Sequence, residues 1–290
     1  MKCTKISIII MILFSFPSNC QKQDKKNKID FKFVSGVLLV NGIVDESIHG
    51  IFQINTGANN SFIRKKIADK LNIIPSGKVK GPGPGGKIIE APTAEVKSIS
   101  IGDYSTSLSS CAIVDMKNQK APERFLGLIG SDFLKNFIVT IDYKEKVLVF
   151  EDKLSLNARL FSGIKIPIKF NKNAPNIPYM SVTINDSING EYIFDTGVPI
   201  THLSNSDFQA IGLTKDMQDI QKKSKNILGS KFETFYTNIS SFALNDSLKI
   251  INFKIATCED CNNGLIGNNF ISCFIVTLNY KEKYILFNRI

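Results

Sequence analysis

The chain has 290 residues and a formal net charge of +10, and 43% of its residues are hydrophobic. This length allows one large or two small domains with buried cores, and the many aromatic and branched residues exclude a disordered chain. The charge comes from dispersed lysines with four arginines. Nucleic-acid-binding proteins usually have Arg and Lys clustered in one stripe with aromatic residues between them. Because the lysines here are dispersed, we expect no nucleic-acid partner.

The N-terminus is typical of an exported protein. Two lysines precede an apolar run over residues 6–16, which is too short to span a bilayer permanently. Residues 1–19 are therefore predicted to be a signal peptide. Cys20 follows at a position that resembles a bacterial lipoprotein cleavage site, and residues 20–30 form a polar tether. We expect a lipid-anchored protein of the cell envelope, with a secreted or periplasmic soluble protein as the alternative.

The next part of the chain alternates short apolar runs with turn residues, which predicts β-structure. Residues 31–150 are assigned to an N-terminal lobe. A helix capped by Ser61 is expected over 62–71, and Gly81, Gly83, Gly85 and Gly86 mark a hairpin tip. The other expected elements are strands at 31–34, 37–40, 51–54, 95–101, 111–114, 138–142 and 147–150, and a short helix at 132–137.

The same order of elements then begins again. Residues 151–163 are expected to be a polar linker, and residues 164–290 a second lobe. The expected strands lie at 164–170, 179–184, 192–194, 232–236 and 251–256, with a helix at 204–211.

A repeat can be measured directly in the sequence. Gly127-Leu-Ile-Gly130 recurs as Gly264-Leu-Ile-Gly267, an offset of 137, and Tyr143-Lys-Glu-Lys146 recurs at Tyr280 with the same offset. Asn55-Thr-Gly and Asp195-Thr-Gly are 140 residues apart. A solenoid would repeat every 20–50 residues or so, so this pattern indicates a duplicated domain.

These paired motifs resemble the aspartic proteases of the pepsin and retroviral type. In that family each lobe supplies an Asp-Thr/Ser-Gly turn and an apolar-Gly block that packs across it. The resemblance covers about residues 31–290 and implies an all-β fold with a few short helices, namely a bilobal pepsin-like acid protease fold built from two homologous retropepsin-type lobes. It implies a flap at residues 81–86, a cleft for an extended polypeptide, and neither cofactor nor metal.

The catalytic chemistry of the family requires two carboxylates. They lie close enough to share one proton, so that one acts as general base on a water while the other polarises the substrate carbonyl. Asp195 matches one of them, and Asn55 occupies the position of the missing Asp. An amide cannot shuttle a proton. Thr56 and Thr196 should hydrogen-bond across the lobes, and Gly57 and Gly197 should permit close backbone approach.

Three functions remain open on this basis. The first is a pseudopeptidase that binds an extended polypeptide in the interlobe cleft with strongly impaired peptide-bond hydrolysis. The second is an active aspartic endopeptidase centred on Asp195, and the third is a structural envelope module. A polypeptide substrate or ligand is the expected partner, and membrane attachment is expected only through the lipid anchor.

Two further features have ordinary explanations. In an exported protein, Cys258 and Cys261 are more typical of a local disulfide than of a redox or zinc site, for which helix context and further ligands are missing. His202 lies near the Asp195 turn and is read as a packing or capping residue, so no catalytic role is assigned to it.

Overall fold

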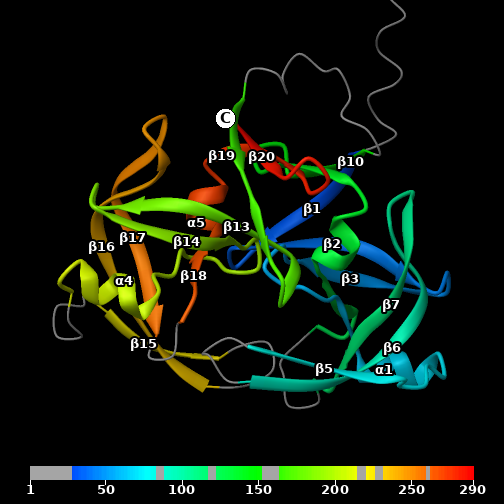
Figure 1. Ribbon diagram of the computed structural model, residues 1–290. Helices are drawn as coiled ribbons and strands as arrows, with labels where there is room; N and C mark the ends of the chain where they lie inside the picture. The colour runs from blue at the N-terminus through cyan, green and yellow to red at the C-terminus, as the bar shows by residue number, and fades with distance from the viewer. Residues whose placement is uncertain are drawn as a thin grey trace, which may run out of the picture.

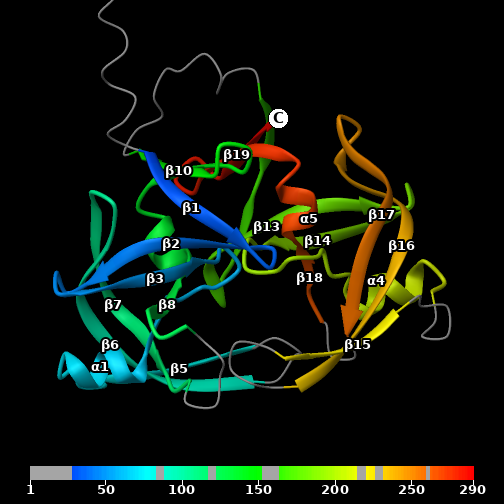
Figure 2. The ribbon, with the colours of Figure 1, turned by 180° about the vertical axis from the view of Figure 1, so that it is seen from behind.

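The computed structural model describes residues 28–82, 88–116, 122–151, 163–213, 220–225, 231–258 and 262–290. These residues form two β-rich lobes that share a set of central strands (Figures 1 and 2). Over the same ranges, every helix is too short to cross a membrane.

In its described residues, the N-terminal lobe contains ten strands and two short helices. They are β1 (Lys28–Val34), β2 (Val37–Val44), β3 (Ile48–Ile54), β4 (Phe62–Arg64), α1 (Lys65–Lys70), β5 (Gly77–Pro82), β6 (Ile88–Ile101), β7 (Tyr104–Val114), β8 (Phe125–Ile129), α2 (Ser131–Leu134), β9 (Ile138–Asp142) and β10 (Val147–Glu151).

The C-terminal lobe repeats this order. Its elements are β11 (Ile164–Pro167), β12 (Lys169–Asn171), β13 (Ala174–Ile184), β14 (Ile188–Phe194), α4 (Asn205–Ala210), β15 (Ile220–Lys225), β16 (Lys231–Asn245), β17 (Leu248–Cys258), β18 (Gly264–Ile266), α5 (Asn268–Ile271), β19 (Phe274–Asn279) and β20 (Tyr284–Arg289).

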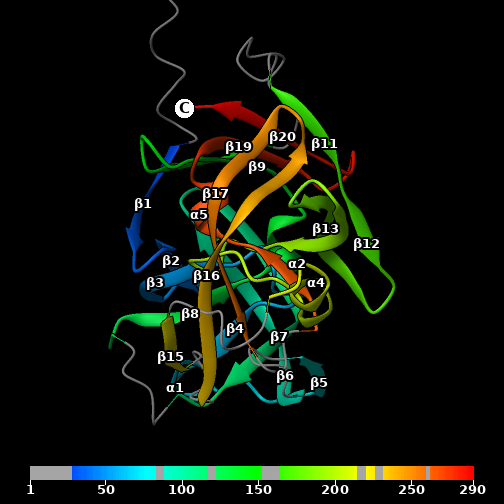
Figure 3. The ribbon, with the colours of Figure 1, turned by 90° about the vertical axis from the view of Figure 1, so that its left-hand side faces the viewer.

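The lobes are joined by a shared antiparallel run of strands in the order β11-β20-β19-β9-β10-β1 (Figure 3). The order is symmetric, because β9 and β19 are equivalent strands of the two lobes and pair with each other at its centre. Thr140 and Thr277 face one another there, and their hydroxyls are 2.8 Å apart. These two threonines are 137 residues apart, so the duplication produces an approximate two-fold axis through this pair.

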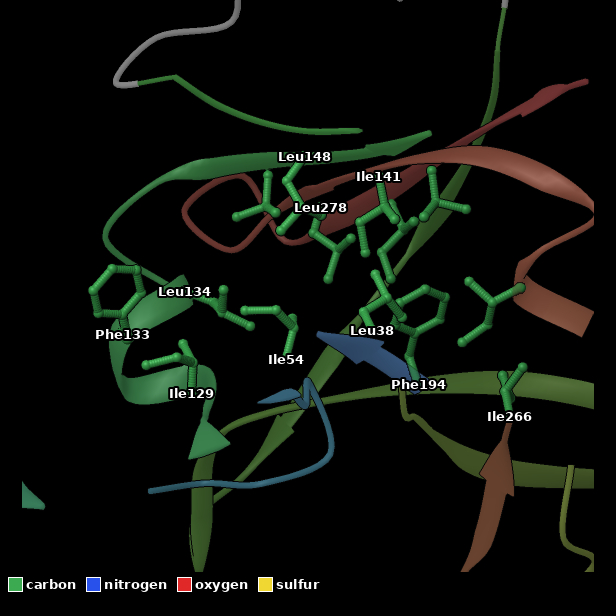
Figure 4. Close-up of a cluster of buried hydrophobic side chains, with 14 of the residues drawn as sticks. Leu38, Ile54, Ile129, Phe133, Leu134, Ile141, Leu148, Phe194, Ile266 and Leu278 are labelled. Carbon is green, nitrogen blue, oxygen red and sulfur yellow. The ribbon is translucent and has the colours of Figure 1, made fainter. Parts of the chain in front are cut away.

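The core continues from one lobe into the other. Alternate residues of β9 and β10 are buried, as expected for strands with one face on a core. Figure 4 shows Leu148, Ile141 and Leu278 of the shared strands above Ile54 and Phe194, which end β3 and β14. The residues directly before Asn55 and Asp195 are therefore fixed in one continuous apolar core.

Several sequence predictions need correction. The expected helix over 62–71 is a strand, β4, followed by the six-residue α1, because Phe62 pairs with both β7 and β8. Ser61 therefore does not cap it. The last three residues of the expected 20–30 tether belong to β1. By contrast, the predicted helix over 204–211 is confirmed as α4, with Ser204 as its N-cap.

Candidate active site

Asn55 and Asp195 each directly follow a strand whose last residue is buried, β3 and β14 respectively. Each strand pairs in parallel with the apolar block of its own lobe, β8 or β18. The backbone N–H of Asn55 donates to Ile129 O at 2.9 Å, and that of Asp195 donates to Ile266 O at 3.0 Å. The two Gly-Leu-Ile-Gly blocks are thus the strands that hold the two turns in place.

The two threonines bind the turns to each other across the lobes. Thr56 Oγ1 donates to Phe194 O at 2.6 Å, and Thr196 Oγ1 donates to Ile54 O at 3.2 Å. Each hydroxyl also accepts the backbone N–H of the other threonine, both at 3.1 Å. Both side chains are buried. The predicted cross-lobe threonine contacts are present, and they place the turns side by side.

The side chains of Asn55 and Asp195 are oriented by the glycine of their own turn. Asn55 Oδ1 accepts the Gly57 N–H at 2.8 Å, and Asp195 Oδ1 accepts the Gly197 N–H at 2.7 Å. A side chain at Gly57 would overlap the Asp195 carboxyl group, and one at Gly197 would overlap the Asn55 amide. Both glycines are therefore required for close approach, and Asn55 and Asp195 each lie against the opposite turn.

Burial dominates the electrostatics of the carboxyl group. Asp195 is 7% exposed, and desolvation raises the pKa of its side chain from 3.8 to about 6. The N–H groups of Gly197 and Gly57 oppose this shift because they stabilise the carboxylate. The partner side chain is the amide of Asn55, which adds no charge. Asp195 is thus a single buried carboxyl group that is mostly ionised at neutral pH.

Polar side chains behind each turn hydrogen-bond to one another and to the turn's supporting strand, and the sequence analysis did not predict them. In the N-terminal lobe, Ser61 donates its hydroxyl to Asp132 at 2.6 Å and accepts the Gly130 N–H at 2.8 Å. Burial raises the pKa of the Asp132 carboxyl group. In the C-terminal lobe, Thr201, Asn269 and Gly267 make the corresponding contacts. The repeat offsets of 140 and 137 would have identified both pairs.

Tyr143 and Tyr280 each hydrogen-bond to a residue of the other lobe close to its Thr-Gly turn. Tyr143 donates to Asn268 Oδ1 at 2.7 Å, and Tyr280 OH lies 3.0 Å from Ser131 Oγ. Ser131 in turn donates to Thr56 O at 2.7 Å. Each tyrosine is the first residue of a repeated Tyr-Lys-Glu-Lys segment. The two tyrosines are buried, and each connects its own lobe to a short helix of the other lobe, α5 for Tyr143 and α2 for Tyr280.

The expected flap corresponds to the hairpin of β5 and β6, which pair from Gly77↔Thr93 to Pro82↔Ile88. Gly81 lies in β5, whereas Gly83, Gly85 and Gly86 lie outside the described residues. A second hairpin, of β15 and β16, extends from the other lobe. Its first strand was not predicted from the sequence, because the segment is rich in lysine and lacks the alternation of a half-buried strand.

The remaining candidate residues are placed as follows. Cys20 and Cys261 lie outside the described residues, so the lipidation of Cys20 and the Cys258–Cys261 disulfide stay predictions. His202 is half-buried between β17 and β18, and burial lowers its pKa to about 4, so it is neutral at physiological pH. Within the described ranges, no cluster of three or more His, Cys, Asp or Glu side chains could hold a metal ion.

Comparison with known proteins agrees with this geometry. The sequence model described as "gag-polyprotein putative aspartyl protease" matches residues 40–136, and the one described as "Aspartyl protease" matches residues 180–270. Each match contains one of the two Thr-Gly turns. The chain is therefore a two-lobed member of the pepsin/retropepsin-like aspartic protease family.

The same fold is found among solved structures. The crystal structure of basic 7S globulin from soybean is similar to this chain with a TM-score of 0.55 at 9% sequence identity. The match covers 90% of this chain and 94% of the globulin chain. No curated protein matches the sequence. The predicted all-β, bilobal fold is thereby confirmed.

Proposed function

We propose that this protein binds an extended polypeptide between its two Thr-Gly turns and its hairpins, and that peptide-bond hydrolysis there is strongly impaired. The observation that carries the proposal is Asn55 itself. Its amide occupies the place of the second carboxyl group, with its Oδ1 held by the Gly57 N–H at 2.8 Å.

The chemical argument rests on proton transfer. Asp195, with a pKa of about 6, can act as a base towards a water molecule at neutral pH. Asn55 can donate a hydrogen bond to a carbonyl oxygen, but it has no proton to give to the leaving amine. Losing one general acid–base removes about 10² to 10⁴ in rate, and more where two groups act as a unit.

Binding has separate support. The threonine contacts hold the two turns side by side, and the N–H groups of Gly57 and Gly197 orient the side chains of Asn55 and Asp195. Hairpin strands such as β5 and β15 offer edges to which an extended peptide adds by main-chain hydrogen bonds.

The test is a peptide library incubated with the purified protein from acidic to neutral pH, with Asp195→Asn as the matched variant. Products and retained peptides are both identified by mass spectrometry. We expect retained peptides, and cleavage no faster than that of Asp195→Asn. Cleavage that Asp195→Asn abolishes would instead establish an active endopeptidase. A protein that neither retains nor cleaves peptides would be a structural envelope module.

A further inference from the structure

A pocket of about 380 Å³ lies on the hairpin of β13 and β14 in the C-terminal lobe, and this volume is within the range of small-molecule binding sites. Ser181 pairs with Glu191 in this hairpin, and Thr183 pairs with Asn189. Directly paired residues of an antiparallel sheet share one face. Four polar side chains therefore line the pocket together, and Leu244 of β16 also lines it.

The polar face of the hairpin is accessible to solvent. Ser181, Asn189 and Glu191 are exposed, whereas Val182 and Tyr192 of the same strands are buried. Successive residues of a strand point to opposite faces, so the buried residues belong to the core side and the polar residues to the outer side. A ligand can therefore reach the pocket, and its polar side chains can be changed without altering the core.

The polar groups of the pocket offer both donors and acceptors. Thr183 Oγ1 donates to Asn189 Oδ1 at 3.0 Å, which leaves the amide N–H groups of Asn189 as donors and the Thr183 oxygen as an acceptor. The hydroxyl of Ser181 can donate and accept. Glu191 Oε1 accepts from Lys169 Nζ, and Oε2 of the same carboxylate can accept from a ligand. Because Lys169 balances the charge of Glu191, the pocket favours a neutral ligand over an ion.

The N-terminal lobe shows that the shared fold does not require this polar set. The equivalent positions lie 140 residues earlier, in β2 and β3, where Asn41 pairs with Ile51 and Ile43 pairs with His49. Two of these four residues are isoleucine. The four polar residues together are therefore a property of the C-terminal lobe.

The pocket is separate from the two Thr-Gly turns. Asn189 and Glu191 precede Asp195 by six and four residues along the extended strand β14. At about 3.3 Å per residue, they lie roughly 13 to 20 Å from the turn. A ligand in the pocket would leave the space between the turns open.

We propose that the pocket on the outer face of β13 and β14 binds a neutral saccharide. Each hydroxyl of a sugar ring both donates and accepts, which suits a set that combines an amide donor, two hydroxyls and a carboxylate acceptor. Leu244 offers an apolar contact to the C–H groups of the ring. An apolar ligand would leave the polar groups unpaired. This inference does not depend on the proposed function, because it concerns a different surface of the protein.

The experiment is saturation-transfer difference NMR and NMR titration of the purified full chain with three probes, cellobiose, maltose and N,N′-diacetylchitobiose. The test variant is Ser181→Ala/Asn189→Ala. The matched control is Asn41→Ala/His49→Ala, which removes two exposed side chains at the equivalent positions of the N-terminal lobe. Thermal melting establishes that all three proteins are folded.

We expect at least one of the three disaccharides to bind with a Kd in the millimolar range, and this Kd to be insensitive to salt because the ligand is neutral. Ser181→Ala/Asn189→Ala should raise the Kd about tenfold, because two hydrogen-bonding groups are lost, whereas the control should leave it unchanged. Absence of binding for all three probes, or equal weakening by both double substitutions, would overturn this inference. Peptide retention that Ser181→Ala/Asn189→Ala abolishes would show that the pocket binds polypeptide instead.

Discussion

Replacing Asn55 by aspartate would restore the second carboxyl group with almost no change in shape. The Oδ1 atom would keep the Gly57 N–H, now at 2.8 Å, and the other amide position would become an oxygen. Gly197 has no side chain and leaves room for this group. Because the threonine contacts already fix both turns, positioning would not have to be rebuilt.

The expected gain follows from the proton that this carboxyl group supplies. Asp195 already has a pKa of about 6, and a second carboxyl group beside it would share one proton with it and titrate as a coupled pair. Restoring a general acid–base group typically increases the reaction rate by a factor of about 10² to 10⁴. We therefore expect Asn55→Asp to raise kcat/KM for peptide hydrolysis by at least about 10², with an acidic to mildly acidic optimum. Repulsion between the two carboxylates should make the variant slightly less stable at neutral pH.

The assay is cleavage of a quenched fluorescent peptide library between pH 3 and 7. The double variant Asn55→Asp/Asp195→Asn has one carboxyl group again and should return to background, which controls for contaminating proteases. A folded Asn55→Asp variant without any gain would show that more than the proton carrier has been lost. Cleavage by the natural protein at a rate similar to that of Asn55→Asp would refute the reasoning.

Four further predictions follow from the same geometry. Burial raises the pKa of Asp195 from 3.8 to about 6, so the stability contributed by this carboxyl group is present below about pH 4 and is lost as the pH rises through 6. In urea denaturation, Asp195→Asn should therefore increase the free energy of unfolding at pH 7 by up to about 3 kcal/mol more than it does at pH 4. An equal effect of the substitution at both pH values would contradict this. In NMR, Asp195 should titrate in one step, and two coupled carboxyl steps at the site would be inconsistent with Asn55 as its neighbour. Thr56→Val should lower the free energy of unfolding by about 1–3 kcal/mol, because the buried carbonyl of Phe194 would lose its hydrogen-bond donor. A denaturation midpoint equal to that of the natural protein would show that this cross-lobe contact does not contribute to stability. Mass spectrometry of the native N-terminus should show residues 1–19 absent and Cys20 lipidated; a retained Met1 in a cytoplasmic fraction would disprove export.

The sequence alone determined the fold class and the two turns. Duplicated motifs at offsets of 137 and 140 identify two homologous lobes, because a repeated pattern of apolar residues and glycines demands the same local backbone twice. Asn55 and Asp195 could be assigned because each directly follows an apolar strand. The missing carboxyl group is a property of the residue type itself, so no structure was needed to see it.

Other features depended on which strands pair. The helix expected over 62–71 begins instead with the strand β4, because Phe62 is paired with a strand on each side. These backbone pairings outweigh the helical spacing of apolar residues, which extends over only ten residues. A lysine-rich segment such as β15 forms a strand through its partner β16 and not through its own pattern.

Contacts between the lobes came only from the tertiary structure. Nothing in the local sequence shows that Tyr143 reaches Asn268 or that Tyr280 reaches Ser131, because such contacts depend on how two lobes are rotated about their common axis. The raised pKa of Asp195 has the same origin. In the unfolded chain this carboxyl group has an ordinary pKa. The packing of both lobes around it removes the water that would stabilise its charge, and this raises the pKa.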